Sequence, residues 1–529
     1  MATREPRVLI VGAGVGGIAL ACKLQMQLDF ENYMIYDRNA SVGGTWYMST
    51  YPGVGCDIES HFYSFSFNRK PDWEKMFASG GEILEYIRDT AEKFGVTDHV
   101  QLNTEVCSAH WVEEDQVWRV HLKNIKTGVE FMREAEVFIS AAGVFGRPRD
   151  CDVEGCESFR GKIVHTAEWD WSLDLQDKDI AVIGNGCSAA QLVPSLVPLA
   201  RTLVQFQRSP QYYFERPNRR FTGIEKFLFR YAPFYDLWYR YNIYRDADAF
   251  HASFMSDSET QIRQREILQQ RSLDYMYRTA PKKYHDILTP DFPAGCKRRI
   301  FDPGYLECLH DDRVTLTNDR VARITEDSIV TKSGQEYKVD VICLATGYKV
   351  QEFLQPMEIY GKKGKSLQTH WQETGGAQAY KSTYISNFPN LGLLFGPNSF
   401  PSNSSVIFTN EVTADYIIKT MIKPILRGHF RSIEVKESAE MVDSSYTQKR
   451  LSNSVWSENC TNWNLNSNGK NTTNYYDYAC NFWYSRVKPR WKDFNINGGS
   501  VHDILIPPMA TALGTAFLTS SIAAFYYLK

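Results

Sequence analysis

Two glycine-rich segments have the residue types and spacing of turns that bind dinucleotide phosphates. In the first, VLIVGAGVGGIALACKL, an apolar strand-like run precedes Gly12, Gly14 and Gly17, and a helical pattern follows. Glycines in such a turn let the backbone bend sharply, approach a pyrophosphate and pack a helix against a strand. Twenty residues after Gly17, the strand-like YMIYD ends at Asp37, which can accept hydrogen bonds from both ribose hydroxyls. An acid here would repel a ribose phosphate, so this segment predicts a site for FAD or NAD and not for NADP.

The second segment, DIAVIGNGCSAAQLVPSL, repeats the pattern of strand, small residues and helix. Its small residues are Gly184, Gly186 and Ala189. The next strand-like run, TLVQFQRSP, offers Arg208 and Ser209 where the first segment has Asp37. A guanidinium and a hydroxyl suit the 2′-phosphate of NADPH, whereas the alternative is a plain surface arginine. The opposite chemistry of the two segments predicts FAD at the first and NADPH at the second.

Two further strand-like runs end in small residues and flank the second segment. They are EVFISAAGVFGRP (136–148) and DVICLATGY (340–348), and we interpret them as points where the chain crosses between domains. A chain of 529 residues is also too long for one core. The predicted fold is α/β, with an NADPH domain inserted into an FAD domain, both Rossmann-like, plus a helical insertion. The predicted ranges are 1–150 and 336–430 for the FAD domain, 151–215 and 291–335 for the NADPH domain, 216–290 for the helical insertion, and 431–529 for a C-terminal region.

Bulk composition narrows the class of protein and its compartment. A net charge of −3 and a pI near 6.4 give no reason to expect a nucleic-acid partner. The start, MATREPRVLIVG, enters a strand pattern at once, so we expect no secretory signal. The eleven cysteines, without a CxxC pair, are interpreted as reduced thiols rather than a disulfide framework. Together these features predict a cytoplasmic protein.

The last residues contain a long uncharged run. From Met509 to Leu528 the chain carries no charge for 20 residues, a length that suits a membrane-spanning helix. Many of these residues are Ala, Ser, Thr or Gly, so the hydrophobicity is marginal. A helix docked on the body is favoured, and a weak tail anchor or membrane-surface helix is the alternative.

The segment FRGKIVHTAEWDW lies between the two glycine-rich segments and resembles a known fingerprint. Phe159, Gly161, His165, Trp169 and Asp170 match F-x-G-x-x-x-H-x-x-x-W-[PD] of the type I Baeyer–Villiger monooxygenases, which are class B flavoprotein monooxygenases. The N-hydroxylating and sulfur- or nitrogen-oxidising relatives lack the Trp-Asp/Pro ending. The resemblance covers nearly the whole chain apart from 211–290 and the last fifty residues, and it continues through GGTWYMSTYPG, CDIESHFYSFSF, QRSP, CKRRIFDPGYLECL and CTNWNLNSNGK.

The resemblance implies roles for individual residues, and it implies no metal site. The implied FAD-binding residues are Gly12, Gly14, Gly17, Asp37, Gly44, Thr45, Trp46, Asp57, Tyr63 and Val106. The implied NADPH-binding residues are Gly184, Gly186, Ala189, Arg208, Ser209, Lys297 and Trp463. The fingerprint residues Phe159, Gly161, His165, Trp169 and Asp170 belong to the interdomain linker, where His165 and Trp169 help to couple domain movement to catalysis and are not acid–base groups.

The resemblance also implies the reaction. NADPH reduces FAD, O₂ adds to give a C4a-peroxyflavin, and this attacks a ketone to form a Criegee intermediate, which rearranges to an ester or lactone. Both species carry negative charge on oxygen, which the guanidinium of Arg298 would stabilise, with Asp57 as its carboxylate partner. The alternative for Arg298 is a structural ion pair in the basic run Lys297 to Arg299.

Two positions depart from the family pattern, and other functions stay open. Gly55 stands where the family often has an arginine, so the site is expected to lose a positive group, and Asn464 follows Trp463 where a tyrosine is usual. The alternatives are an N- or S-monooxygenase, an uncoupled NADPH oxidase, and a disulfide reductase. The last would need a CxxC or CxxxxC pair near the flavin, and we expect none there.

The segment 211–290 carries no motif but is rich in aromatic residues. Six of them follow one another at helix-like steps: Phe227, Tyr231, Phe234, Trp238, Tyr241 and Tyr244. The favoured interpretation is a helical pair that packs an aromatic stripe into the core. The alternative is that the insertion walls the substrate tunnel and selects bulky or long apolar ketones.

Overall fold

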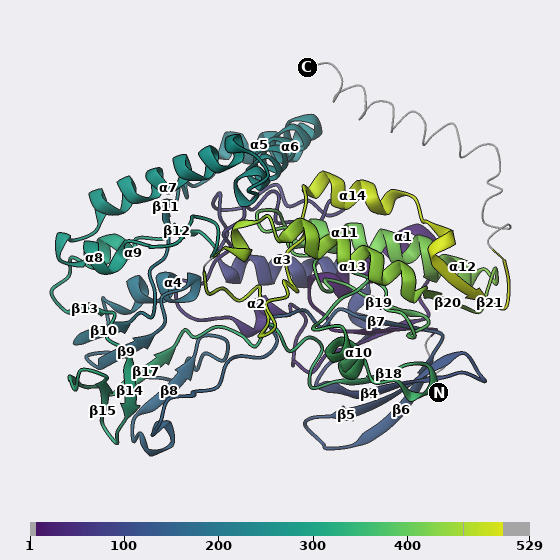
Figure 1. The fold of residues 1–529 in the computed structure, drawn as a ribbon, viewed down its shortest axis with the longest axis horizontal. Coiled ribbons are helices and arrows are strands. Elements are labelled where there is room, and N and C mark those ends of the chain that lie inside the picture. Colours follow the sequence, from purple (N-terminus) through teal and green to yellow (C-terminus); the bar gives the residue numbers. More distant parts are fainter. Residues whose placement is uncertain (1–6, 459, 501–529) are drawn as a thin grey trace.

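Two five-stranded parallel sheets form the centre of the protein. The computed structural model describes residues 7–458 and 460–500. The first sheet has the order β19-β7-β1-β2-β3, and the second has the order β13-β10-β9-β17-β8. Their strands are β1 (Val8–Val11), β2 (Tyr33–Tyr36), β3 (Val100–Gln101), β7 (Val137–Ser140) and β19 (Leu391–Leu393), then β8 (Lys162–His165), β9 (Asp179–Ile183), β10 (Thr202–Phe206), β13 (Val314–Thr317) and β17 (Val341–Leu344). The two sheets lie side by side, as Figure 1 shows, and confirm the predicted α/β fold with two dinucleotide-binding domains.

The order of strands shows where the chain crosses between the sheets. After β7 the chain leaves the first sheet, builds the second, and returns with β19. The strand β17 pairs in parallel with β8 and β9, so it belongs to the second sheet. The prediction gave residues 336–430 to the FAD domain. Its start at residue 336 is therefore too early, because β17 still belongs to the second sheet. Both runs that end in small residues do lie next to a crossing, because β7 precedes the second sheet and β17 is the last strand added to it.

Each central strand is hydrophobic because both faces of its sheet are covered, one by helices and the other by a small antiparallel sheet. Val8, Leu9 and Ile10 of β1 have no exposed surface. The helices are α1 (Val15–Leu28), α2 (Thr45–Met48), α3 (Gly80–Lys93), α4 (Cys187–Leu196), α9 (Tyr305–Cys308), α10 (Leu367–Glu373), α11 (Val406–Ile417), α12 (Lys423–Leu426), α13 (Glu437–Leu451) and α14 (Ala479–Val487). Helix α1 follows β1 directly and packs against α11 from the far end of the chain. The first domain is thus built from both ends of the sequence.

Smaller sheets brace the two lobes. A four-stranded sheet, β18-β4-β5-β6, lies beside the first lobe, and a three-stranded sheet, β14-β15-β16, beside the second (Figure 1). Two pairs, β11-β12 and β20-β21, complete the set. The bounds are β4 (Thr104–Val112), β5 (Val117–Asn124), β6 (Glu130–Ala135), β11 (Tyr213–Glu215), β12 (Ile300–Asp302), β14 (Val321–Ile324), β15 (Ser328–Thr331), β16 (Glu336–Lys338), β18 (Glu358–Tyr360), β20 (Ser432–Val435) and β21 (Phe494–Asn497).

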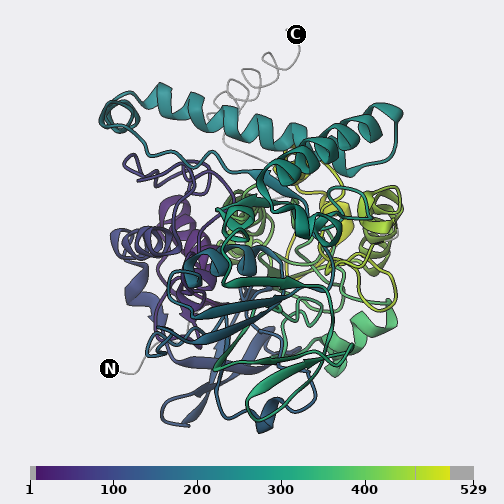
Figure 2. The same cartoon turned by 90° about the vertical axis from the view of Figure 1, so that its left-hand side faces the viewer.

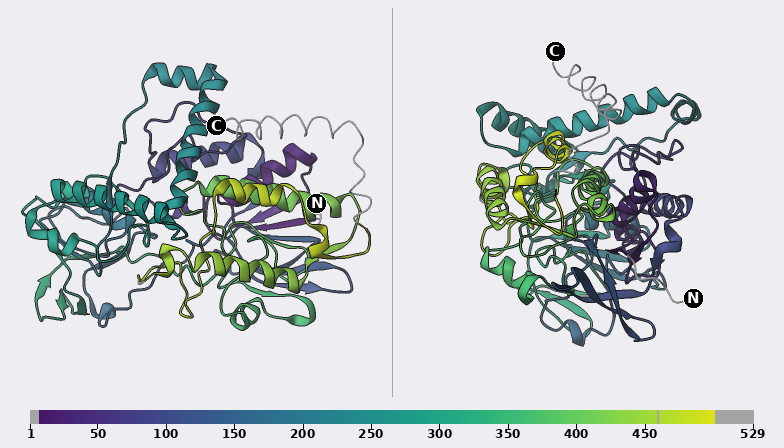
Figure 3. Two further views of the ribbon diagram at one scale, coloured as in Figure 1. Left: turned by 45° about the horizontal axis from the view of Figure 1, so that its top comes forward. Right: turned by 90° about the vertical axis from the view of Figure 1, so that its right-hand side faces the viewer.

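The predicted helical insertion lies between β11 and β12, which pair in parallel and close its base. It contains α5 (Gly223–Tyr231), α6 (Pro233–Ala249), the 3₁₀ turn η3 (Phe250–Phe254), α7 (Glu259–Thr279) and α8 (His285–Leu288). Capping boxes at Thr222 and Ser258 start α5 and α7 by satisfying their first backbone N–H groups. These helices run along the upper edge of the molecule in Figures 1 and 2, and part of them stands out from the body in Figure 3.

The aromatic stripe of this insertion is only partly in the core. Five of the six residues predicted to pack inward are 44–85% exposed: Phe227, Tyr231, Phe234, Trp238 and Tyr241. Helix α6 carries aromatic residues on more than one face. Tyr235 and Tyr239, four residues apart, pack instead on the core that includes Val8 and Ile10 of β1. The core interpretation is therefore wrong for these five. Trp238 also does not line the cavity described below, which argues against a tunnel wall at that residue.

The cysteines also differ from the prediction. Four of the eleven form two disulfides, Cys151–Cys156 and Cys296–Cys460. The second joins residues 164 positions apart with Cα atoms 6.4 Å from each other, a separation suited to a disulfide. Spacing along the sequence could not reveal a pair that only the fold brings together. The cysteines therefore no longer support the prediction of a cytosolic compartment.

The C-terminal prediction falls outside what the structure describes. Residues 509–528 lie beyond Ser500, the last described residue. Across 7–458 and 460–500, no helix has the length and apolar character needed to cross a membrane.

Candidate active site

The first glycine-rich turn forms a backbone surface with no space for side chains. Gly12 has a φ of +103°, and a Cβ atom there would lie 2.5 Å from the carbonyl oxygen of Ala141. A Cβ on Gly17 would lie 2.0 Å from the carbonyl oxygen of Gly12, so only glycine lets α1 start this close to the turn. Gly14 faces Gly44 across the turn, where a Cβ on Gly44 would lie 2.8 Å from the Gly14 Cα. Such a turn at the start of a helix fits a pyrophosphate.

Asp37 lies at the carboxyl end of β2, beside this turn. Its Oδ2 accepts a hydrogen bond from the backbone N–H of Ala13 at 2.7 Å, and its Oδ1 accepts one from Asn39 at 2.8 Å. Burial raises the pKa of this carboxyl, and the two backbone donors oppose that rise. Because a carboxylate oxygen can accept more than one hydrogen bond, both oxygens keep capacity for ribose hydroxyls.

Residues predicted to lie along a flavin gather next to the same turn. Thr45 opens α2 directly after Gly44, and the indole N–H of Trp46 donates to the Tyr63 hydroxyl at 3.1 Å. Val106 is farther along, buried on β4, whose first residue Thr104 donates its backbone N–H to the Asp37 carbonyl at 2.9 Å. The group therefore extends from the turn toward Tyr63 on one side and toward Val106 on the other.

The second turn repeats the geometry of the first. Gly184 has a φ of +122°, and a Cβ there would lie 2.4 Å from the carbonyl oxygen of Ala345, as Gly12 does with Ala141. A Cβ on Gly186, in contrast, would meet open space, while Ala189 is fully buried in α4. In each domain the first glycine of the turn lies against the carbonyl of an alanine that directly follows the neighbouring strand. The two turns are therefore built alike.

Two cations and a hydroxyl meet beyond the second turn. The Lys297 Nζ donates to the Ser209 Oγ at 2.5 Å, and Arg208 next to it is exposed. Burial and the charge of Arg208 lower the pKa of Lys297 to about 8. The positive charges of Lys297 and Arg208 repel each other, so an anion bound between them would be stabilised. Together with the Ser209 hydroxyl, the two cations could hold a phosphate.

Substitution of Gly12 tests the first turn. We expect Gly12→Ala to reduce the flavin content of the purified protein about 10-fold or more, since the strained φ and the contact with Ala141 cost about 1–3 kcal/mol. Gly81→Ala is a matched control, because a Cβ there meets nothing within 4 Å. The ratio of flavin absorbance to protein absorbance measures the effect. A Gly12→Ala protein with the flavin content of the wild type would contradict the prediction.

Arg298 and Asp57 form a two-pronged ion pair. Arg298 donates from Nε to Asp57 Oδ2 at 2.6 Å and from Nη2 to Oδ1 at 2.8 Å, while its Nη1 donates to the Ser402 carbonyl at 3.1 Å. Burial raises the pKa of Asp57, but the charge and hydrogen bonds of Arg298 outweigh it, so the net pKa lies below the usual range. Burial likewise lowers the pKa of Arg298, and Asp57 more than restores it. Both groups are therefore charged near neutral pH.

This ion pair faces a cavity with aromatic walls. Arg298 and Asp57 both line it, and the Phe400 ring lies 5.3 Å from the guanidinium carbon. Trp463 packs against Phe400, with ring centroids 5.7 Å apart. Other lining residues are Ile58, Phe254, Lys297, Arg299, Phe301 and Trp456. The cavity thus joins the fixed arginine to the lysine of the phosphate-binding group.

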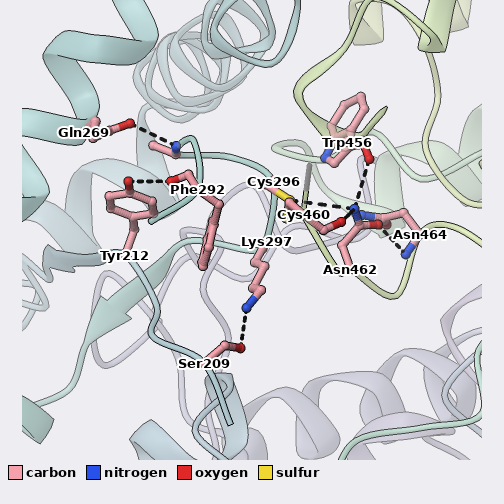
Figure 4. Close-up of a disulfide and its surroundings, with 11 residues drawn as sticks. Ser209, Tyr212, Gln269, Phe292, Cys296, Lys297, Trp456, Cys460, Asn462 and Asn464 are labelled. Atoms are coloured by element: carbon pink, nitrogen blue, oxygen red, sulfur yellow. Dashed lines mark hydrogen bonds between the residues drawn. A yellow bond between two sulfur atoms is a disulfide. The ribbon is translucent and has the colours of Figure 1, made fainter. Parts of the chain in front are cut away.

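The disulfide Cys296–Cys460 ties two walls of this cavity together (Figure 4). Cys296 directly precedes Lys297 and Arg298, and Cys460 lies three residues before Trp463. The Asn462 side-chain amide donates to the carbonyl of Trp456 at 3.0 Å and to that of Cys460 at 3.2 Å. The loop that carries Trp463 is therefore linked covalently to the segment that carries the arginine.

Asn464, a departure from the family pattern, is buried in this loop. Its Oδ1 accepts a hydrogen bond from the Thr473 hydroxyl at 2.8 Å, and its carbonyl accepts one from the Thr472 backbone N–H at 3.1 Å. It also lines the cavity. The residue therefore helps to shape the loop around Trp463.

Gly55, the other departure, has a cation beside it that the sequence did not reveal. A Cβ on Gly55 would lie 3.6 Å from Nη2 of Arg216, and this Nη2 donates to the Cys56 carbonyl at 2.9 Å. Arg216 follows β11 and belongs to no motif, so its approach to the segment before Asp57 depends on the tertiary fold alone. Arg216 does not line the cavity, so the expected loss of a positive group in the site stays a prediction.

The fingerprint residues lie at the junction of the lobes and do not line the cavity. A Cβ on Gly161 would lie 2.2 Å from the Asp340 carbonyl, so this glycine lets β8 start beside β17. His165 ends β8 and is 8% exposed; its Nδ1 accepts from the Ala167 backbone N–H, and burial lowers its pKa. Trp169 is buried in the core that includes Ile180 and Val182 of β9. The Asp170 carboxylate accepts hydrogen bonds from the Ser172 backbone N–H and hydroxyl. Phe159, like Cys151 and Cys156, packs against the core that includes Ile324 and Ile342.

The pair Cys151 and Cys156 does have the CxxxxC spacing that a disulfide reductase requires. It lies in the linker, where a Cβ on Gly155 would be 2.0 Å from the carbonyl of Ile324 on β14. Both cysteines pack against the core of the second sheet. The chain therefore contains one such pair, and the expectation that none lies near the flavin stays a prediction.

Known proteins resemble this chain over most of its length. A family model described as pyridine nucleotide-disulphide oxidoreductase matches residues 9–210, which contain both glycine turns. An FAD-binding monooxygenase of Aspergillus niger is 31% identical over 501 residues, covering 93% of this chain and 82% of that protein. A Baeyer–Villiger monooxygenase of Pseudomonas aeruginosa is 31% identical over 484 residues, covering 91% of this chain and 89% of its own.

Solved structures agree in fold. A cyclohexanone monooxygenase from Rhodococcus sp. Phi1 bound to NADP⁺ superimposes with a TM-score of 0.82 at 24% identity, covering 94% of this chain and 100% of that one. A steroid monooxygenase bound to NADP gives a TM-score of 0.80 at 24% identity, covering 93% and 99%. The fold is thus shared with such enzymes, and the sequence relatives match nearly the whole chain. This chain belongs to the family of Baeyer–Villiger monooxygenases, which are FAD- and NADPH-dependent.

Proposed function

We propose that this protein uses NADPH and O₂ to insert one oxygen atom beside the carbonyl of a ketone, giving an ester or lactone. The observation that carries the proposal is the Arg298–Asp57 ion pair in a cavity that also reaches Lys297. The substrate is a small molecule, and the aromatic walls of the cavity favour an apolar one.

The residues present fit both cofactors. The Gly12 and Gly184 turns each leave a bare backbone where a Cβ atom would clash, which suits a pyrophosphate. Asp37 would hold the ribose of FAD, and Arg208, Ser209 and Lys297 would hold the 2′-phosphate of NADPH. When bound, FAD reduced by NADPH supplies the oxygen-transfer chemistry.

Arg298 would stabilise negative charge on the oxygen atoms of the reaction. A guanidinium held by Asp57 and by the Ser402 carbonyl is already oriented before the substrate binds, so little energy is spent on ordering it. Phe400 and Trp463 beside it exclude water and strengthen its field. Asp57 is a positioning residue for this arginine.

A panel of cyclic, linear and aryl ketones tests the proposed reaction. NADPH consumption and ester formation are measured together, and we expect at least one ketone to give ester in proportion to the NADPH consumed. Oxidation of NADPH without ester across the whole panel would favour an uncoupled oxidase. Efficient oxidation of sulfides or amines with no ester would favour an S- or N-monooxygenase.

Removal of the disulfide beside the cavity should destabilise the protein. We expect Cys460→Ser to lose about 2–4 kcal/mol of stability, because Cys296 and Cys460 close a long loop of chain. Cys107→Ser is the control, since Cys107 is a free thiol on β4. Thermal unfolding without reductant measures both variants, and an unchanged melting temperature for Cys460→Ser would contradict the expectation.

A further inference from the structure

Two helices of the insertion present a set of large apolar side chains to the outside. We call this set the α5–α6 face. Every member is at least 44% exposed, and Phe234 reaches 85%. The members are Ile224, Phe227, Tyr231, Phe234, Leu237, Trp238 and Tyr241. Exposed apolar groups of this size, gathered on adjacent helices, are typical of interaction surfaces.

The face results from rigid packing and not from a frayed segment. Its residues follow each other at steps of three and four, so they share one side of each helix. The opposite side of α6 is fixed by polar contacts: Asp236 bonds Arg69 at 2.6 Å and lies 3.3 Å from His61, while Arg240 donates to Ser64 Oγ at 2.6 Å. In Figure 3 the helices of this region stand out at the upper edge of the molecule.

Basic residues stand between the apolar members of the face. Between residues 226 and 245 the only carboxylate is Asp236, which is 3% exposed and paired. Lys226, Arg230 and Arg245 are the cations of this stretch that lie outside the buried network of Arg240. Of these, Arg230 pairs with Asp72 at 3.1 Å and Arg245 with Asp246 at 2.9 Å. A surface of Trp, Tyr, Phe and Leu with Lys and Arg between them is the composition of an interfacial membrane helix.

We propose that the α5–α6 face docks on a lipid bilayer. The sequence supports a lipid as occupant in a second, separate place, because residues 509–528 carry no charge over a length that suits a bilayer. A second copy of the chain as the occupant is an outcome of the test below. In the proposed complex the aromatic rings enter the headgroup region.

Vesicle flotation with the full-length protein tests the proposal. The vesicles contain phosphatidylcholine and phosphatidylserine. We expect the wild-type protein to float with them and the double variant Phe234→Ser/Trp238→Ser to bind about 10-fold less or weaker still, because two large apolar contacts are lost. The matched control is Val442→Ser/Tyr484→Ser, which removes two equally exposed apolar residues, on α13 and α14, and should float as the wild type does.

Flavin content and turnover of a water-soluble ketone show that each variant is folded, because none of these four residues lines the cavity. The proposal is overturned if the wild-type protein does not float, or if the face variant floats as well as the wild type does. It is also overturned if the wild type is a dimer that the face variant dissociates without any difference in flotation, since a second copy would then occupy the face.

Discussion

Arg298→Ala should still oxidise NADPH but form ester about 10²–10³-fold more slowly than the wild-type enzyme. The Arg298 guanidinium lines the cavity while its Nε–Nη2 edge is held by Asp57 and its Nη1 by the Ser402 carbonyl. Its charge is therefore fixed where negative charge on oxygen would develop. Alanine keeps the space but removes that charge, so oxygen transfer suffers and cofactor reduction continues. Parallel assays of NADPH consumption and ester formation separate the two effects.

The same substitution also leaves Asp57 without its partner. A buried carboxylate that loses its cation is destabilising, so the flavin content and the melting temperature of the variant must be measured first. Arg298→Lys retains the charge without the two-pronged geometry and should recover part of the ester yield. Arg313→Ala is a neutral control, because Arg313 forms an exposed pair with Asp311. Ester formation at a near-normal rate by a folded Arg298→Ala enzyme would show that Arg298 is only a structural ion pair.

The glycine turns could be predicted from the sequence because their constraints are local. Gly12 and Gly184 need a positive φ, and each follows a buried strand at a fixed distance. Those conditions are set by a few adjacent residues, so a linear pattern is enough to find them. The contrast between Asp37 and Arg208 is local in the same sense, because each residue follows the first strand after the glycine turn of its domain.

The features that the sequence did not predict depend on contacts between distant segments. Arg216 reaches the Cys56 carbonyl only because β11 returns to the first lobe, and Cys296 meets Cys460 only because the C-terminal loop folds over the cavity. The prediction that the exposed aromatic residues are buried was wrong for a related reason. Helical spacing shows that Phe234 and Trp238 share a side of α6, but not whether that side faces the core or the outside. In α6 the polar anchors Asp236 and Arg240 decide this, by binding inward.

Loss of Lys297 should weaken NADPH binding and leave NADH binding nearly unchanged. We expect Lys297→Met to raise the KM for NADPH about 10–100-fold, the size of one lost charge-assisted hydrogen bond to a phosphate. NADH lacks that phosphate, so its KM should hardly move. Lys282→Met, at an exposed lysine of the same insertion, is the control and should leave both values as they are.

The pH dependence of NADPH binding distinguishes this role from a merely structural one. Burial and Arg208 lower the pKa of Lys297 to about 8, so the lysine is charged below that pH and neutral above it. NADPH affinity should therefore be high below pH about 8 and fall as the pH rises beyond it, because a neutral amine attracts the phosphate less. Arg208 keeps part of the binding at high pH. In Lys297→Met the KM for NADPH should lose this pH dependence while the weaker binding through Arg208 persists. A wild-type KM that is flat across pH 8, or a variant that keeps the same profile, would mean that the Lys297 ammonium does not contact the phosphate.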